Sequence, residues 1–183
     1  MFRNYTPKEV QANKAKSSVE RKIRDDVLET YPRLEPVIEE IWPKKGGNVL
    51  LGKTKSKIQM VIVDEEVIFF QPTDKSEKWF PTLRVLHKYP SMMPKFQVDT
   101  GAIKFVLKGA DIMCPGLTHP TGGAMEDVPA GTCVQIVAEN KENACAVGLT
   151  AMSAADIRST NKGLGVLSMH CLNDCLWKEG TVS

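Results

Sequence analysis

The sequence predicts an α+β protein made of two domains, residues 1–93 and residues 94–183. Two observations support this prediction. The first part combines helical apolar stripes with runs of Val, Ile and Phe, whereas the second part consists of short strands separated by glycine turns. The stretch 89–95, which contains two prolines, separates the two patterns. We therefore expect N-terminal helices on a small antiparallel sheet, followed by a small mixed barrel.

The first domain should begin with an amphipathic helix. Ser17 and Glu20 have the spacing of a capping box, and an apolar stripe continues from there to Tyr31, directly before Pro32. A second short helix is expected over residues 35–42. The remaining elements expected in this domain are three antiparallel strands and a closing helix, over residues 48–52, 57–64, 67–71 and 81–89.

The second domain should contain mostly short strands. A hairpin is indicated where two apolar runs flank the polar turn 140–143, and Pro115 and Gly116 indicate another turn. Ser153 is placed to cap a short helix. The expected strands and helices of this domain cover residues 96–99, 100–108, 111–114, 132–139, 144–149, 153–160 and 166–170.

Length and composition limit the class of protein. The chain has 183 residues, of which 42% are hydrophobic and 25% charged, as in ordinary globular domains and unlike disordered or fibrous chains. The opening residues lack the apolar core of a signal peptide, and the apolar runs 60–63 and 67–70 are too short to cross a membrane. The five cysteines have irregular spacings, which favours reduced thiols. We expect a cytoplasmic protein without membrane association.

Positive charge is concentrated in the first domain. Residues 1–94 carry 17 Lys and Arg against 13 Asp and Glu, net +4, whereas residues 95–183 carry 7 against 9, net −2. Between Ile41 and Val63 there are five lysines and no acidic residue. We call these five residues the lysine cluster: Lys44, Lys45, Lys53, Lys55 and Lys57. Such a cluster indicates a site for a polyanion, although a solvated surface with no ligand would look the same in the sequence.

A phosphate-binding loop is suggested by residues 47–54, GNVLLGKT, and by the apolar run that ends at Asp64. The chemistry requires this loop to begin a helix that leads into a parallel strand. Only residues 55–59 separate the two motifs, and a strand–helix–strand crossover needs at least about 10 residues. We therefore reject nucleotide hydrolysis.

No catalytic, metal or cofactor site is indicated elsewhere. His170, Cys171 and Cys175 lack the second ligand pair of a zinc site, and His87 and His119 lack a patterned acid and nucleophile. Four aromatic side chains lie in or beside apolar runs, where a core position is more common than base stacking: Phe69, Phe70, Trp79 and Phe80.

Several segments carry a family resemblance. The run 96–117, FQVDTGAIKFVLKGADIMCPGL, closely resembles the opening of PUA domains, the small RNA-binding pseudobarrels of pseudouridine synthases and archaeosine transglycosylases. Four further segments resemble the malignant T-cell-amplified sequence family: 42–45 (WPKK), 80–90 (FPTLRVLHKYP), 161–165 (NKGLG) and 172–177 (LNDCLW). The resemblance covers nearly the whole chain and implies that the second domain is a PUA pseudobarrel.

The resemblance also implies a function. Members of this family are non-enzymatic translation factors that act with density-regulated protein on the small ribosomal subunit, in reinitiation, tRNA recruitment or release, and post-termination recycling. The partners implied here are therefore the small subunit, rRNA or tRNA, and density-regulated protein, with no cofactor. An alternative is a subunit or accessory protein of an RNA-modification enzyme that uses its PUA domain to bind structured RNA. An adaptor that binds only proteins is a third reading.

Two further sets of residues are candidates for binding. Lys104 and Lys108 lie four residues apart on the expected helix 100–108 and would project from one face toward phosphate. Met92 and Met93 could form an adaptable apolar patch for the protein partner, or could instead seal the seam between the domains. The acidic pair Glu126 and Asp127 lies beside the expected RNA face and would oppose phosphate.

Overall fold

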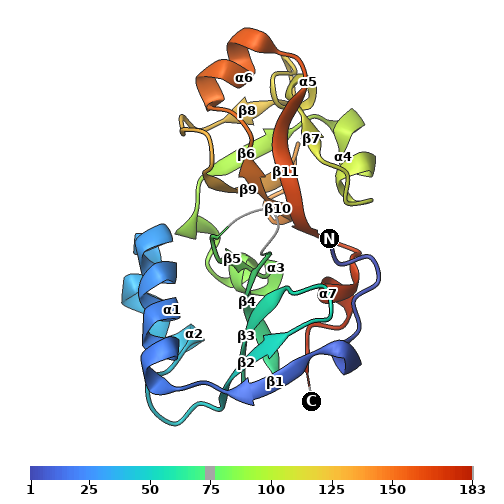
Figure 1. The fold of residues 1–183 in the computed structure, drawn as a ribbon. Helices are drawn as coiled ribbons and strands as arrows, with labels where there is room; N and C mark the ends of the chain where they lie inside the picture. The colour runs from blue at the N-terminus through green and yellow to red at the C-terminus, as the bar shows by residue number, and fades with distance from the viewer. Residues whose placement is uncertain (73–76, 183) are drawn as a thin grey trace.

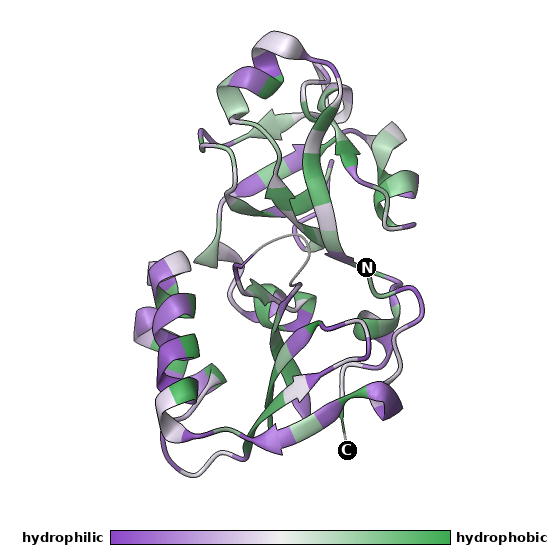
Figure 2. Cartoon of the chain, viewed as in Figure 1, coloured by the Kyte–Doolittle hydropathy of each residue, from purple (hydrophilic) through white to green (hydrophobic). Residues whose placement is uncertain are grey.

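The computed structural model describes residues 1–72 and 77–182, and it contains two β-sheets stacked end to end (Figure 1). One sheet belongs to the first half of the chain and the other to the second half, so the α+β class is confirmed. Figure 2 shows hydrophobic residues along the strands of both sheets and hydrophilic residues over much of α1 (Ser17–Thr30), as expected for a helix with one buried side. Within the described ranges, no helix has the length and apolar character required to cross a membrane.

The first sheet is a five-stranded antiparallel meander in the order β1-β2-β3-β4-β5. Its strands are β1 (Gln11–Lys14), β2 (Val49–Lys53), β3 (Gln59–Val63), β4 (Glu66–Gln71) and β5 (Phe80–Pro81). The three central strands confirm the prediction. The two edge strands were not expected, because β1 is polar at three of its four positions and β5 has only two residues.

The first half also contains three α-helices within the described residues. They are α1, α2 (Ile38–Ile41) and α3 (Leu83–Lys88), and a 3₁₀ turn covers Pro32–Val37, so the expected helix 35–42 is only partly α-helical. The predicted capping box is wrong. Lys16 is the N-cap of α1 without a side-chain cap, and the carboxylate of Glu20 instead accepts a 3.1 Å hydrogen bond from Trp42 Nε1.

The second sheet is mixed and has the order β7-β11-β10-β9-β6-β8. Its strands are β6 (Lys95–Val98), β7 (Ile112–Met113), β8 (Ala124–Met125), β9 (Cys133–Ala138), β10 (Ala144–Thr150) and β11 (Leu164–Cys171). Only β6 and β9 pair in parallel within the described residues. Strand β10 has register shifts on both sides, and such bulges increase the twist of a strand. At one of them Gly148 is required, because a Cβ there would lie 2.4 Å from Val166 Cγ1.

Four short helices belong to the second half: α4 (Thr100–Val106), α5 (Cys114–Leu117), α6 (Ala154–Thr160) and α7 (Cys175–Lys178). Ser153 caps α6 as predicted, its Oγ accepting from Asp156 N at 3.1 Å. Helix α4 ends two residues earlier than expected, and a turn that leads to Gly109 at φ 75° follows it. Helix α5 replaces the turn predicted at Pro115 and Gly116.

The end of the chain returns to the first sheet. After β11, Val67 N donates to Gly180 O at 3.0 Å and Val182 N donates to Glu65 O at 2.7 Å. Phe2 lies between the halves, with its ring edge-on to Phe70 at 4.9 Å and to His170 at 5.8 Å between centroids. One cluster of buried apolar residues therefore extends across both halves, and a second cluster lies within the second half alone. The exact domain boundary between residues 93 and 94 stays a prediction.

Candidate nucleic-acid interface

The segment that looks like a phosphate loop is a β-hairpin. Residues 49–53 form β2, and Lys53 pairs with Gln59 at the start of the antiparallel strand β3. Gly52 is buried within the sheet, where a Cβ would lie 2.6 Å from Val10 Cγ1. The backbone N–H groups of this segment are therefore used for strand pairing and do not surround an anion, in agreement with the rejection of nucleotide hydrolysis.

All members of the lysine cluster are exposed, but the structure divides them into two groups. Lys53, Lys55 and Lys57, which we call the lysine triplet, lie together at the turn between β2 and β3. Thr54 is buried and fixes this turn, because its Oγ1 accepts from Ile58 N at 3.1 Å. The other two lysines precede β2 at the opposite end of this strand, which is about 14 Å long at 3.4 Å per residue.

The two lysines before β2 differ in their surroundings. Lys44 Nζ lies 3.4 Å from Glu39 Oε1, and the same carboxylate oxygen lies 2.5 Å from Nη2 of the buried Arg24. The backbone N–H of Lys44 and the Arg24 side chain both lower the pKa of Glu39. The charge of Lys44 is therefore partly balanced, whereas Lys45 makes no ion pair with any residue that the structure describes.

An apolar hollow of about 710 Å³ lies beside α4 in the second half. Phe105 and Met113 line it with 54% and 51% of their surface exposed, which is unusual for large apolar side chains in this molecule. Lys104 Nζ lies 5.0 Å from the centroid of the Phe105 ring, within cation–π distance. An exposed ring next to a cation is the arrangement that stacks nucleobases in single-stranded RNA sites.

Sequence reasoning missed Phe105 and Met113 as site residues. Phe105 is adjacent to Val106, which is 2% exposed. Neighbours on a helix differ in direction by about 100°, so both residues could not face one core. That periodicity was the available signal. No such periodicity predicts the exposure of Met113, since β7 has only two residues.

The predicted pairing of Lys104 with Lys108 on one helix face is wrong. Because α4 ends at Val106, Lys108 lies in the following turn, where its N–H donates to Phe105 O at 3.1 Å and its carbonyl accepts from Arg3 Nη2 at 3.3 Å. Both lysines are exposed. Lys108 lines a second hollow, and Lys104 does not.

The acidic pair Glu126 and Asp127 is engaged within the protein. Glu126 Oε1 accepts from Lys95 N at 2.8 Å, and Asp127 forms an ion pair with Arg158 on α6. Arg158 partly balances the charge of Asp127, whereas the backbone N–H beside Glu126 leaves the negative charge of that carboxylate in place.

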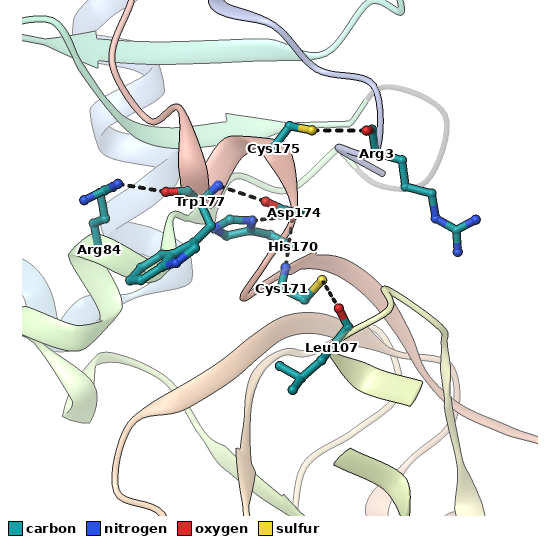
Figure 3. Close-up of polar contacts among 8 residues, drawn as sticks. All are labelled: Arg3, Arg84, Leu107, His170, Cys171, Asp174, Cys175 and Trp177. Atoms are coloured by element: carbon teal, nitrogen blue, oxygen red, sulfur yellow. Dashed lines mark hydrogen bonds and ion pairs between the residues drawn. The ribbon is translucent and has the colours of Figure 1, made fainter. Parts of the chain in front are cut away.

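His170 and the neighbouring cysteines form part of the packed seam (Figure 3). His170 Nδ1 lies 2.7 Å from Asp174 Oδ2, and burial raises the pKa of the Cys171 thiol to about 11. No group of three or more potential ligands could hold a metal ion among residues 1–72 and 77–182. His87 also packs at the seam, where its Nε2 lies 2.8 Å from Ala144 O. The four aromatic residues considered for base stacking, Phe69, Phe70, Trp79 and Phe80, are all buried.

Met92 and Met93 are also buried, with 3% and 2% of their surface exposed. Gln135 Nε2 donates to Met93 O at 2.9 Å and to Pro90 O at 2.6 Å, which ties this linker to β9. A partner cannot contact side chains that are covered in this way, so the expectation of a docking patch is corrected. The alternative that they seal the seam agrees with their burial.

The fold and its similarities define the class of protein. Residues 5–90 match the family described as "Pre-PUA-like domain", and residues 93–175 match the one described as "elF2D, PUA domain". A PUA domain from Aeropyrum pernix has the same fold, with a TM-score of 0.70 at 22% identity over 94% of this chain and 92% of that chain. The chain is thus a PUA-domain protein, and its curled second sheet is the predicted pseudobarrel.

Curated relatives give the particular family. The chain is 47% identical to Translation machinery-associated protein 20 of Eremothecium gossypii, over the whole of both chains. It is 43% identical to Malignant T-cell-amplified sequence 2 of Mus musculus, over 99% of each chain. The protein belongs to the malignant T-cell-amplified sequence family, as its motifs predicted.

Proposed function

We propose that this protein is a non-enzymatic, cytoplasmic RNA-binding factor of the translation machinery. The main support for this proposal is the full-length similarity to Translation machinery-associated protein 20, whose name associates that relative with the translation machinery. The PUA match over residues 93–175 supports RNA as the ligand. The exposed lysine triplet and the exposed Phe105 ring offer it a charged surface and a stacking surface.

The proposed site of action is the small ribosomal subunit. There the protein would act with density-regulated protein in reinitiation, in tRNA recruitment or release, and in post-termination recycling. The family membership supports this step. Since Met92 and Met93 are buried, the protein partner must use another surface.

The two RNA-binding surfaces would contribute in different ways. The lysine triplet and Lys45 would contact phosphates, which gives affinity without sequence preference and a strong dependence on salt. The Phe105 ring would stack on an unpaired base, a contact worth about 1–3 kcal/mol and much less sensitive to salt. A single-stranded segment next to a structured RNA presents both features.

Co-sedimentation with purified small ribosomal subunits tests this proposal. We expect the protein to sediment with the subunits, more completely when density-regulated protein is added, and to dissociate as salt increases. A variant of the lysine triplet, with all three residues changed to Gln, should lower the slope of log affinity against log salt by about 2, at about 0.7 per phosphate contact.

The matched control removes three exposed charges from other surfaces: Lys88→Gln, Lys141→Gln and Lys162→Gln. It should keep the wild-type slope. Failure of the wild-type protein to bind small subunits, with or without density-regulated protein, would contradict the proposed function. Equal slopes for the triplet variant and the control would exclude the turn between β2 and β3 as the contact surface.

A further inference from the structure

A second hollow, of about 290 Å³, lies at the seam between the two halves. The N-terminal segment, the turn after α4, the end of β11 and α7 surround it. Three cationic side chains line it, each from a different segment and each exposed: Arg3, Lys108 and Lys178. Among the described lining residues the only carboxylate is that of Asp174.

The carboxylate of Asp174 does not balance these three charges. Its Oδ2 accepts from Cys171 N at 3.1 Å and lies 2.7 Å from His170 Nδ1, and its Oδ1 accepts from Trp177 N at 2.9 Å (Figure 3). The side chain is only 8% exposed. The oxygens of this acid are engaged in capping α7 and contacting His170, and one carboxylate against three cationic side chains leaves the hollow an excess of positive charge.

Two hydrogen bonds hold Arg3 beside this hollow. Arg3 O accepts a hydrogen bond from Cys175 Sγ at 3.1 Å, and Arg3 Nη2 donates to Lys108 O at 3.3 Å. Figure 3 shows the Arg3 side chain extending away from His170 and Asp174. A guanidinium has five N–H donors, so four remain for a ligand after this one bond. Lys108 and Lys178 form no ion pair with any described residue.

We propose that this hollow binds a phosphate group of single-stranded RNA, an inference that rests on the proposed function. A guanidinium fork and two ammonium groups suit phosphate oxygens. Lys108 is also close to Phe105 along the chain, because Lys108 N donates to Phe105 O at 3.1 Å in the turn that follows α4. An RNA strand whose base stacks on Phe105 would reach the hollow if its backbone followed this turn.

Fluorescence anisotropy with a labelled short single-stranded RNA tests the proposal. The variant Arg3→Gln/Lys178→Gln should lower the slope of log affinity against log salt by about 1.4, from two lost contacts at about 0.7 each. The control Lys141→Gln/Lys162→Gln removes two exposed charges elsewhere and should keep the wild-type slope. Lys178→Gln alone leaves the hydrogen bond of Arg3 intact and should lower the slope by about 0.7.

The outcomes separate this inference from the proposed function. Equal slopes for the double variant and its control, with RNA still bound, overturn the phosphate site and leave the proposed function standing. No RNA binding by the wild-type protein overturns both. Inorganic phosphate and a mononucleotide, added at matched ionic strength, should displace RNA no better than chloride does. If either competitor displaces RNA more strongly than chloride does, and this difference is lost in Arg3→Gln/Lys178→Gln, the ligand of the hollow is a free phosphate. That result would overturn RNA as its ligand.

Discussion

The side chain of Phe2 should determine whether the two halves unfold as one unit. It is 1% exposed, and its ring lies edge-on to three others, at 4.9 Å from Phe70, 5.7 Å from Tyr5 and 5.8 Å from His170. Phe70 belongs to the first sheet and His170 to the second. The substitution Phe2→Ala therefore removes the ring that links the N-terminal segment to both sheets.

The loss of stability expected for Phe2→Ala follows from the burial of this side chain. Replacing a fully buried Phe by Ala costs about 3–5 kcal/mol, because the apolar contacts are lost and a cavity remains. In a domain of this size each kcal/mol lowers the melting temperature by about 2–4 °C, so Phe2→Ala should lower it by about 6–20 °C. Differential scanning calorimetry measures this shift. The wild-type protein should show a single transition, since one core connects the halves.

The matched control is Phe105→Ala, the same substitution at a ring that is 54% exposed. This substitution should lower the free energy of unfolding by much less than Phe2→Ala does. The melting temperature should fall by no more than about 4 °C. If Phe2→Ala melts like the control, the N-terminal segment does not seal the seam. Two separate transitions in the wild-type protein would likewise refute the reasoning, because they would show that the halves unfold independently.

Three further predictions concern binding, the linker and the buried thiols. Phe105→Ala should weaken the binding of single-stranded RNA by about 5- to 150-fold, the equivalent of about 1–3 kcal/mol of stacking, in an anisotropy titration. Met92→Ser with Met93→Ser should lower the melting temperature by more than 4 °C and leave partner pull-down intact, and the reverse outcome would restore the docking patch. Burial raises the pKa of the Cys133 thiol from 9.0 to about 11. As the pH rises, the thiol therefore loses its proton in the unfolded chain before it does so in the folded protein, which favours unfolding. The free energy of unfolding, measured by urea titration, should fall between about pH 9 and pH 11. A constant stability over that range, or the same slope in Cys133→Ala, would contradict the last prediction.

Sequence patterns predicted the elements whose signals are local. The meander of the first sheet follows from apolar runs separated by polar turns, and the cap of α6 depends on one residue, Ser153, and the backbone three residues later. The capping box failed because the carboxylate of Glu20 binds Trp42, a residue 22 positions away that local spacing does not reveal. The polar strand β1 was missed for a similar reason, since it exists through its pairing with β2.

The candidate site was predicted only in part. Charge alone located the lysine cluster, but the direction of each strand decides which lysines lie together, so the division into a triplet and a separate pair required the structure. Met92 and Met93 were assigned from residue type and linker position, and the hydrogen bonds of Gln135 that bury the linker are long-range. The second hollow joins residues 3, 108 and 178, which no local pattern could connect.

Cross-linking of the protein to RNA on the small ribosomal subunit tests the central claim most directly. Ultraviolet irradiation of the complex, followed by mass spectrometry of the nucleotide-bearing peptides, identifies the residues that touch RNA. We predict cross-links in two places, the turn that carries the lysine triplet and the segment from Lys104 to Lys108. A complex that forms without any cross-link to either segment would contradict the assignment of these surfaces to RNA.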